Sequence, residues 1–158
     1  MSEHRVKMTI NGRRCEAMVE GRVSLTDFLR EEAGYTGVHA GCEHGACGSC
    51  TVIVDGLAVR SCLMLAAQAD GASITTVEGL ADPGGKLHRV QQMLMDEYGL
   101  QCGFCTPGVL MTLAALTGSG EPIDAQDVEA AMSGHLCRCT GYQGIRRAAR
   151  RIAAESPS

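Results

Sequence analysis

Residues 42–50 read CEHGACGSC and place three cysteines within nine positions. The residues between them are mostly Gly, Ala and Ser, so the thiols lie in a stretch of small side chains. The whole chain has 158 residues and nine cysteines, and its opening MSEHRVKMTI contains no apolar run of the kind found in a secretory signal. We therefore expect a cytoplasmic protein, in which reduced thiols bind metal or react rather than form disulfides.

The spacing of these three cysteines indicates an iron–sulfur cluster. They follow the pattern C-x4-C-x2-C, which is typical of plant-type [2Fe–2S] sites and requires a fourth cysteine elsewhere. If Asp55-Gly56 are the two loop residues of the next hairpin, the strand register places Cys50 opposite Ser61. Cys62 then returns beside the cysteine loop. The predicted ligands of the first cluster are Cys42, Cys47, Cys50 and Cys62.

The glycines of this loop suit a backbone that closely surrounds a negatively charged cluster. Gly41, Gly45 and Gly48 let the backbone approach closely and adopt positive φ, so that its N–H groups point inward. A zinc site and a redox disulfide are the competing interpretations, but zinc usually takes two C-x2-C knuckles and a redox pair needs only two cysteines. His39 and His44 flank the loop, and we interpret both as ordinary polar residues.

Four further cysteines lie in the second half of the chain, in QCGFCTPG (101–108) and HLCRCTGY (135–142). Two predicted helices lie between them, each about 15 Å long, and an antiparallel pair brings the two motifs together. Helix starts at Thr106-Pro107 and Thr140-Gly141 would place positive dipole ends near the thiols. For these four cysteines taken alone, a zinc site is an open alternative. Because they accompany the first group, we interpret them as a second [2Fe–2S] site. Its predicted ligands are Cys102, Cys105, Cys137 and Cys139.

The first half of the sequence predicts a β-grasp arrangement. Hairpin turns at Asn11-Gly12 and Asp55-Gly56, a helix in SLTDFLREEAG (24–34) and a last strand in ASITTV (72–77) provide its parts. In that helix, Ser24 is the expected N-cap and Gly34 the C′ residue. Cys15 lies outside both ligand sets, on a strand with inward alternation, and we expect a buried apolar thiol.

The second half predicts a bundle of four short helices. The first carries an apolar face with Leu87 and Tyr98 at its ends and stops at Gly99, and the second is opened by Thr106-Pro107. Asp124 caps the third, and the last runs from Tyr142 to Ile152. We predict an α+β chain with a plant-type ferredoxin-like β-grasp domain over residues 1–78, a linker over 79–86 and a four-helix [2Fe–2S] domain over 87–158.

Other classes of protein fit the sequence poorly. The net charge of −4 disfavours nucleic acid as a partner, and the one basic run, RRAARR (146–151), reads as a solvated helix face or a subunit contact. GVLMTLAALTG (108–118) is too short to span a bilayer. No dinucleotide or phosphate-binding motif is complete. With a cluster to hold in each half, the chain has no room for flavin, molybdenum and substrate, so we expect an electron relay without catalytic residues of its own.

The motifs GCEHGACGSCTV, QCGFCTPG and CRCTGY, in this order, resemble the small iron–sulfur subunit of the molybdenum hydroxylases. That family includes xanthine dehydrogenase, aldehyde oxidase and carbon monoxide dehydrogenase relatives, and the resemblance covers nearly the whole chain. His135 stands where many members have Asn, which is not a ligand position. The resemblance implies a β-grasp domain and a four-helix domain with one [2Fe–2S] cluster each.

The same resemblance implies partners. The second cluster would lie next to a molybdopterin on a large subunit, with Gln101 contacting that cofactor, and a medium subunit would bind FAD. The complex would be a dimer of heterotrimers. The alternatives are a free-standing two-cluster ferredoxin-type carrier and a zinc-binding interaction module without redox function.

Overall fold

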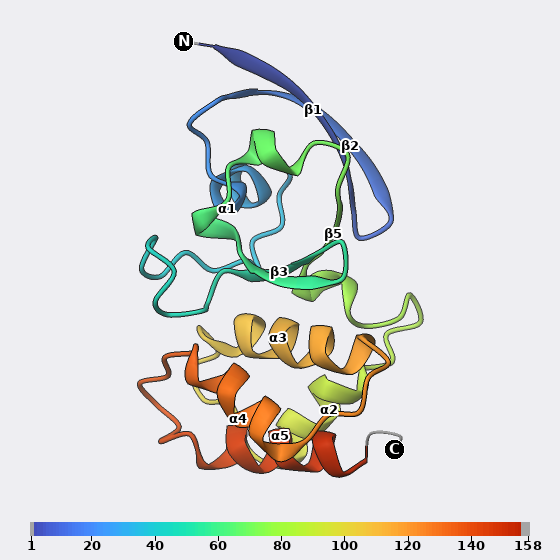
Figure 1. Cartoon of the computed structure of the whole chain (residues 1–158), viewed down its shortest axis with the longest axis vertical. Coiled ribbons are helices and arrows are strands. Elements are labelled where there is room, and N and C mark those ends of the chain that lie inside the picture. Colours follow the sequence, from blue (N-terminus) through green and yellow to red (C-terminus); the bar gives the residue numbers. More distant parts are fainter. Residues whose placement is uncertain (1, 156–158) are drawn as a thin grey trace.

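The computed structural model describes residues 2–155 and confirms an α+β architecture, with a sheet in one half and helices in the other (Figure 1). The strands are β1 (Glu3–Ile10), β2 (Arg13–Glu20), β3 (Thr51–Val54), β4 (Leu57–Arg60) and β5 (Ser73–Thr75). The α-helices are α1 (Leu25–Asp27), α2 (Arg89–Asp96), α3 (Thr106–Gly118), α4 (Ala125–Ser133) and α5 (Gln143–Ala154). Short 3₁₀-helices cover Ser61–Leu63, Ala66–Ala69 and Val77–Gly79.

The sheet has the strand order β2-β1-β5-β3-β4, in which β1 and β5 are parallel and all other pairs are antiparallel. Both predicted hairpin turns are confirmed. Asn11 and Gly12 have φ of 49° and 77°, and Asp55 and Gly56 have 48° and 86°, as two-residue primed turns require. The last strand is shorter than predicted, because only residues 73–75 pair with their neighbours.

The first helix departs from the prediction after one turn. Ser24 caps it as expected, accepting a hydrogen bond from the Asp27 N–H at 3.1 Å, but only three residues are α-helical. Residues 28–32 form a π-helix, closed by a bond of 2.9 Å from the Ala33 N–H to the Phe28 carbonyl. Gly34 ends it with φ of 78°, as predicted. The buried Phe28 and Leu29 still pack against the sheet in the first hydrophobic core.

Helix α3 lies at the centre of the molecule. Seven consecutive residues, 108–114, are buried, so the helix is covered on all sides. Figure 1 shows β3 directly above it and α2, α4 and α5 below. Ile53 of β3 and Leu80 of the predicted linker pack against the second hydrophobic core, which the four helices α2–α5 build. The helical half therefore uses the sheet as one of its walls.

The end of α2 differs from the prediction. The expected apolar face is only half buried: Val90 and Leu94 are enclosed, but Leu87 precedes the helix and Tyr98 is 83% exposed. The helix stops at Asp96, and Tyr98 itself takes the left-handed conformation, with φ of 52°. A bond of 2.8 Å from the Gly99 N–H to the Leu94 carbonyl closes this turn. The left-handed residue is thus Tyr98 rather than the glycine that sequence rules favour.

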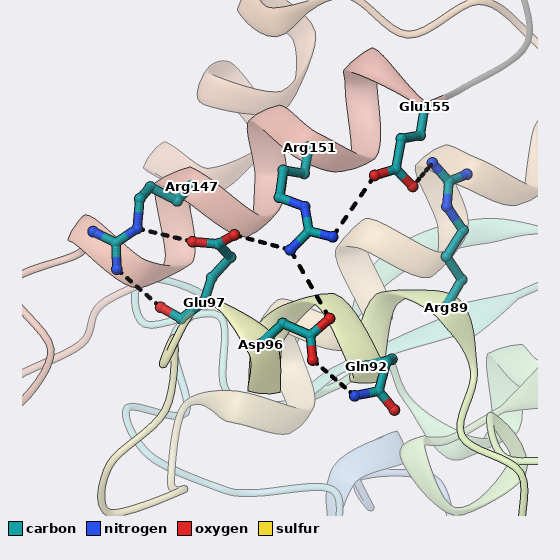
Figure 2. A network of polar contacts seen from close by, with 7 residues as sticks. All are labelled: Arg89, Gln92, Asp96, Glu97, Arg147, Arg151 and Glu155. Atoms are coloured by element: carbon teal, nitrogen blue, oxygen red, sulfur yellow. Dashed lines mark hydrogen bonds and ion pairs between the residues drawn. The ribbon is translucent and has the colours of Figure 1, made fainter.

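The basic run of α5 forms an ion-pair network with α2 (Figure 2). Arg147 and Arg151 both donate to the Glu97 carboxylate at 2.9 Å, and Arg151 also lies 3.8 Å from Glu155. These hydrogen bonds lower the pKa of Glu97 below its ordinary value. The run therefore joins two helices of the same chain. No helix within residues 2–155 is long and apolar enough to cross a membrane.

Two glycine substitutions in α3 test how tightly the halves pack. A Cβ on Gly108 would lie 2.1 Å from the Gly48 carbonyl oxygen, whereas one on Gly118 meets nothing within 4 Å. We expect Gly108→Ala to reduce the free energy of unfolding by about 1–3 kcal/mol, because the new methyl group would clash with a backbone carbonyl that cannot move aside without shifting the chain.

Gly118→Ala is the matched control and should leave stability unchanged or raise it by up to about 1 kcal/mol, through better helix propensity. Denaturant unfolding of the cluster-loaded chain measures both. Equal stability of the two variants would contradict the tight packing of α3 on the cysteine loop.

Candidate metal centres

The first cysteine set lies in the loop before β3 and just after β4. Within the loop, the Cys47 N–H donates to Cys42 Sγ at 3.3 Å. Backbone N–H groups of His44 and Cys47 lower the pKa of Cys42 to about 6, because they stabilise the thiolate. The loop backbone thus favours a negative sulfur before any metal binds.

The predicted hairpin register brings Cys62 back to this loop. Thr51 pairs with Arg60, and the Ser61 N–H donates to the Cys50 carbonyl at 3.4 Å. Burial raises the pKa of Cys62 to about 11, with further contributions from the neighbouring Cys50 thiol and from Cys42. The four cysteines of the first set therefore lie near one another, with Cys62 beside Cys50.

The loop glycines fit their predicted role with one difference. Gly45 and Gly48 have φ of 82° and 77°, as expected, but Gly41 is not among the residues of positive φ. A Cβ on Gly41 would instead lie 3.1 Å from Cys47 Sγ, inside the space beside the thiol. A Cβ on Gly48 would lie 2.4 Å from the His135 ring. Gly41 leaves room for the sulfur, while Gly48 leaves room for the helical half.

The second cysteine set is brought together by the helical half. Cys105 lies beside Cys137 and Cys139 beside Cys102. Burial and the Cys137 thiol raise the pKa of Cys105 to about 12, and the Cys102 thiol raises the pKa of Cys139. Burial opposes the thiolate of Cys137 as well, but hydrogen bonds with Thr140, Cys139 and Cys105 together outweigh it and lower that pKa. Cys102 and Cys139 are exposed, so this set opens onto the surface.

The two helix starts that were expected beside this set differ. Cys105 itself is the N-cap of α3, one residue earlier than predicted, so its thiol lies at the positive end of that helix. Helix α5 begins only at Gln143, because Tyr142 takes φ of 66° and ends the loop. Thr140 is part of the loop and places its hydroxyl oxygen 3.1 Å from Cys137 Sγ. The prediction of a helix start at Thr140-Gly141 was wrong.

Each set consists of two thiol pairs, and this suits a two-iron cluster. Such a cluster distributes four thiolates over two irons, so two cysteines serve each iron. Gly41 leaves space beside the Cys47 thiol of the first set. The residues present therefore fit a [2Fe–2S] cluster in each set.

The two sets meet across the junction between sheet and helices. The Leu136 N–H donates to the Cys47 carbonyl at 2.9 Å, which joins a neighbour of Cys137 directly to the first set. His39 stacks on Phe104 with ring centroids 4.9 Å apart. The loop over residues 41–50, cyan in Figure 1, and the loop over residues 134–142, orange, both lie on the left side of the view.

Sequence reasoning missed the side chains that make this junction. His135 is buried, with Nε2 2.8 Å from Thr112 Oγ1, and burial followed by the charge of Arg60 lowers its pKa to about 4. His44 lies next to the Cys42 carbonyl, while Gln101 is exposed. Cys15 is only half-buried against the first core, and burial raises its pKa. Nothing in the spacing of His135 or Arg60 marks either as an interdomain residue.

Comparison with known proteins agrees with this geometry. The family described as "2Fe-2S iron-sulfur cluster binding domain" matches residues 8–78, and the one described as "[2Fe-2S] binding domain" matches residues 76–150. Caffeine dehydrogenase subunit gamma of Pseudomonas sp. (strain CBB1) is 52% identical over 148 residues, which cover 92% of this chain and 88% of the relative. The xanthine dehydrogenase iron-sulfur-binding subunit of Escherichia coli O157:H7 is 44% identical, with 89% and 88% covered.

Among solved structures, a chain of quinoline 2-oxidoreductase from Pseudomonas putida 86 superposes with a TM-score of 0.89 at 46% identity, covering 98% of this chain and 96% of that one. The chain belongs to the small iron–sulfur subunits of the xanthine dehydrogenase family of molybdenum hydroxylases. As an iron–sulfur subunit of this family, it is part of an oxidoreductase and has an electron-transfer role. The predicted family and fold are confirmed, and the free-standing carrier is not favoured.

Two cysteine substitutions distinguish a proposed cluster ligand from the cysteine that lies outside both sets. Cys15→Ser should retain both clusters and change stability by no more than about 1 kcal/mol, because its thiol packs on the core outside both sets. Cys47→Ser should abolish one of the two electron paramagnetic resonance (EPR) signals of the reduced clusters. Spectra of the reduced complex check both variants, and loss of a cluster in Cys15→Ser would refute the ligand assignment.

Proposed function

We propose that this chain carries electrons from a molybdopterin site on a large partner subunit to FAD on a medium-sized partner subunit. The observation that carries the proposal is the pairing of eight cysteines into two adjacent sets, joined by the Leu136–Cys47 backbone bond. When bound, each [2Fe–2S] cluster supplies one-electron redox chemistry. The chain's own residues hold the clusters, neutralise their charge and fix their separation.

The proposed ligands follow from the two sets. The first cluster is held by Cys42, Cys47, Cys50 and Cys62, within a loop shaped by Gly41, Gly45 and Gly48. The second cluster is held by Cys102, Cys105, Cys137 and Cys139. Each thiol loses its proton on binding iron. The backbone N–H groups that already favour the thiolate of Cys42 support this role for the first loop.

The second set is the electron-accepting end of the chain, and the first set is the donating end. Support comes from exposure: Cys102 and Cys139 reach the surface, and Gln101 is exposed next to Cys102. The Gln101 amide can donate and accept hydrogen bonds, which suits the mixed edge of a pterin. Gln101 is therefore the proposed contact with molybdopterin.

Exposed apolar side chains near both sets support partner subunits on these faces. Phe104, between Cys102 and Cys105, is 48% exposed, and Leu136, next to Cys137, is 58% exposed. Leu63 follows Cys62 and is 65% exposed. Apolar side chains that stay open in one chain commonly mark protein contacts. The proposed assembly is a dimer of heterotrimers.

The proposed domain boundaries are 1–78 and 87–158, with a linker over 79–86. Two separate hydrophobic cores support this division, one around the sheet and α1 and the other among α2–α5. Leu80, within the linker, packs against the second core, so the connection is attached to the helical half.

Metal analysis tests the cofactor content. The chain purified anaerobically with its partners should contain four irons and four acid-labile sulfides, because eight thiols form two four-ligand sets, and little zinc. Full zinc occupancy without labile sulfide would contradict the proposal. A chain that purifies with both clusters but alone would favour the free-standing carrier instead.

Substitution of Gln101 tests the direction of electron flow. Gln101→Ala should slow reduction of the second cluster by substrate about tenfold, the equivalent of one lost hydrogen bond, with both clusters assembled. Gln126→Ala, on the exposed face of α4, is the matched control. Its second cluster should be reduced by substrate at the normal rate. Rapid-freeze EPR follows each cluster, and an unchanged rate in Gln101→Ala would remove this residue from the path.

A further inference from the structure

Arg60 lies at the junction between the two cysteine sets. It is the last residue of β4, two positions before Cys62, and its side chain is half-buried. One guanidinium nitrogen donates to the Gly134 carbonyl of the helical half at 2.7 Å. The other donates to Thr51 Oγ1 of the sheet half. A single side chain therefore bonds to both halves of the molecule.

These two bonds lead directly to the two cluster loops. Thr51 Oγ1, which accepts from Arg60, donates in turn to the Gly48 carbonyl at 2.6 Å, next to Cys47. Gly134 lies three residues before Cys137, and a Cβ there would be 2.6 Å from the guanidinium. The planar fork of arginine suits this arrangement, because it donates in two directions from one rigid group.

The guanidinium has hydrogen-bond acceptors but no paired carboxylate among the residues that the structure describes. Within residues 2–155, no Asp or Glu carboxylate forms an ion pair with Arg60. Charged side chains are almost never fully buried unless they are paired, and removing part of a guanidinium from water without an anion costs free energy. The hydrogen-bond partners of Arg60 lie close in the chain to proposed ligands of both sets: Thr51 directly follows Cys50, and Gly134 lies three residues before Cys137.

We propose that Arg60 is a shared positioning and redox-tuning residue of the two clusters, whose charge stabilises the reduced form of both and whose hydrogen bonds hold the two cluster loops together. This inference rests on the ligand sets of the proposed function. Reduction of a cluster adds one electron, and thus one negative charge, without making or breaking a bond. A fixed positive charge on the side chain that links the two cluster loops favours that step at each site, and salt screens it little because the group is partly buried.

Two substitutions separate the charge from the hydrogen bonds. Arg60→Gln keeps a side-chain donor but removes the charge, and Arg60→Lys keeps the charge but loses the planar fork. Arg5→Gln is the matched control, because it removes a charge from an exposed position on β1. All three are made in the complete complex, and iron and sulfide are measured first. Redox titration with mediators, followed by EPR, then gives the midpoint potential of each cluster.

We expect Arg60→Gln to lower the equilibrium constant for reduction of each cluster at least tenfold. Each midpoint potential then falls by about 59 mV or more. Arg60→Lys should lie closer to the parent protein, and Arg5→Gln should match it. Amide hydrogen exchange at residues 134–136 should be faster in both Arg60 variants, because each loses part of the clamp.

Several results would overturn the inference while leaving the proposed function intact. If Arg60→Gln holds both clusters and their midpoint potentials are unchanged, the tuning role is refuted. If the potential of only one cluster shifts, the shared role of Arg60 is refuted. If Arg60→Gln does not assemble, Arg60→Met replaces it, since Met keeps an apolar stem. Assembly in Arg60→Lys alone would support the charge role. Loss of iron and sulfide from the parent complex would refute the proposed function itself.

Discussion

The close approach of α3 to the first cysteine loop is the constraint on which the rest of the structure depends. At this point Gly108 lies against the backbone of Gly48, and a Cβ on Gly108 would be 2.1 Å from the Gly48 carbonyl oxygen. The contact holds the helical half against the sheet and brings the residues beside Cys47 to those beside Cys137. An electron relay needs two centres held in a fixed arrangement, and this contact between two backbones joins the two cysteine-bearing regions.

The same constraint explains features that look unrelated along the chain. Helix α3 is buried over residues 108–114, with β3 and β4 of the sheet on one side and α2 and α4 packed against it on others. The positive φ of Gly48 lets its loop turn away from α3 without a side chain. The ion pairs of Glu97 with Arg147 and Arg151 join α2 to α5 on the far side of the second core. They therefore brace the helices against which α3 packs.

Much of the fold and the metal chemistry could be predicted from the sequence, because short-range geometry determines them. Two-residue turns fix strand register, which brought Cys62 beside Cys50, and motif spacing indicated two four-cysteine sets. The packing of the halves could not be predicted, since an apolar pattern such as that of α3 does not identify what covers each face. The left-handed turns at Tyr98 and Tyr142 were missed because local rules favour glycine, not tyrosine, at such positions.

The central claim is that one chain holds two [2Fe–2S] clusters near enough to act in series. The most direct test is EPR spectroscopy of the fully reduced complex at two microwave frequencies and low temperature. We predict two signals of equal integrated intensity, with a splitting that is constant in field units and arises from magnetic interaction between the clusters. A single signal, or two signals with no splitting at any temperature, would contradict the account.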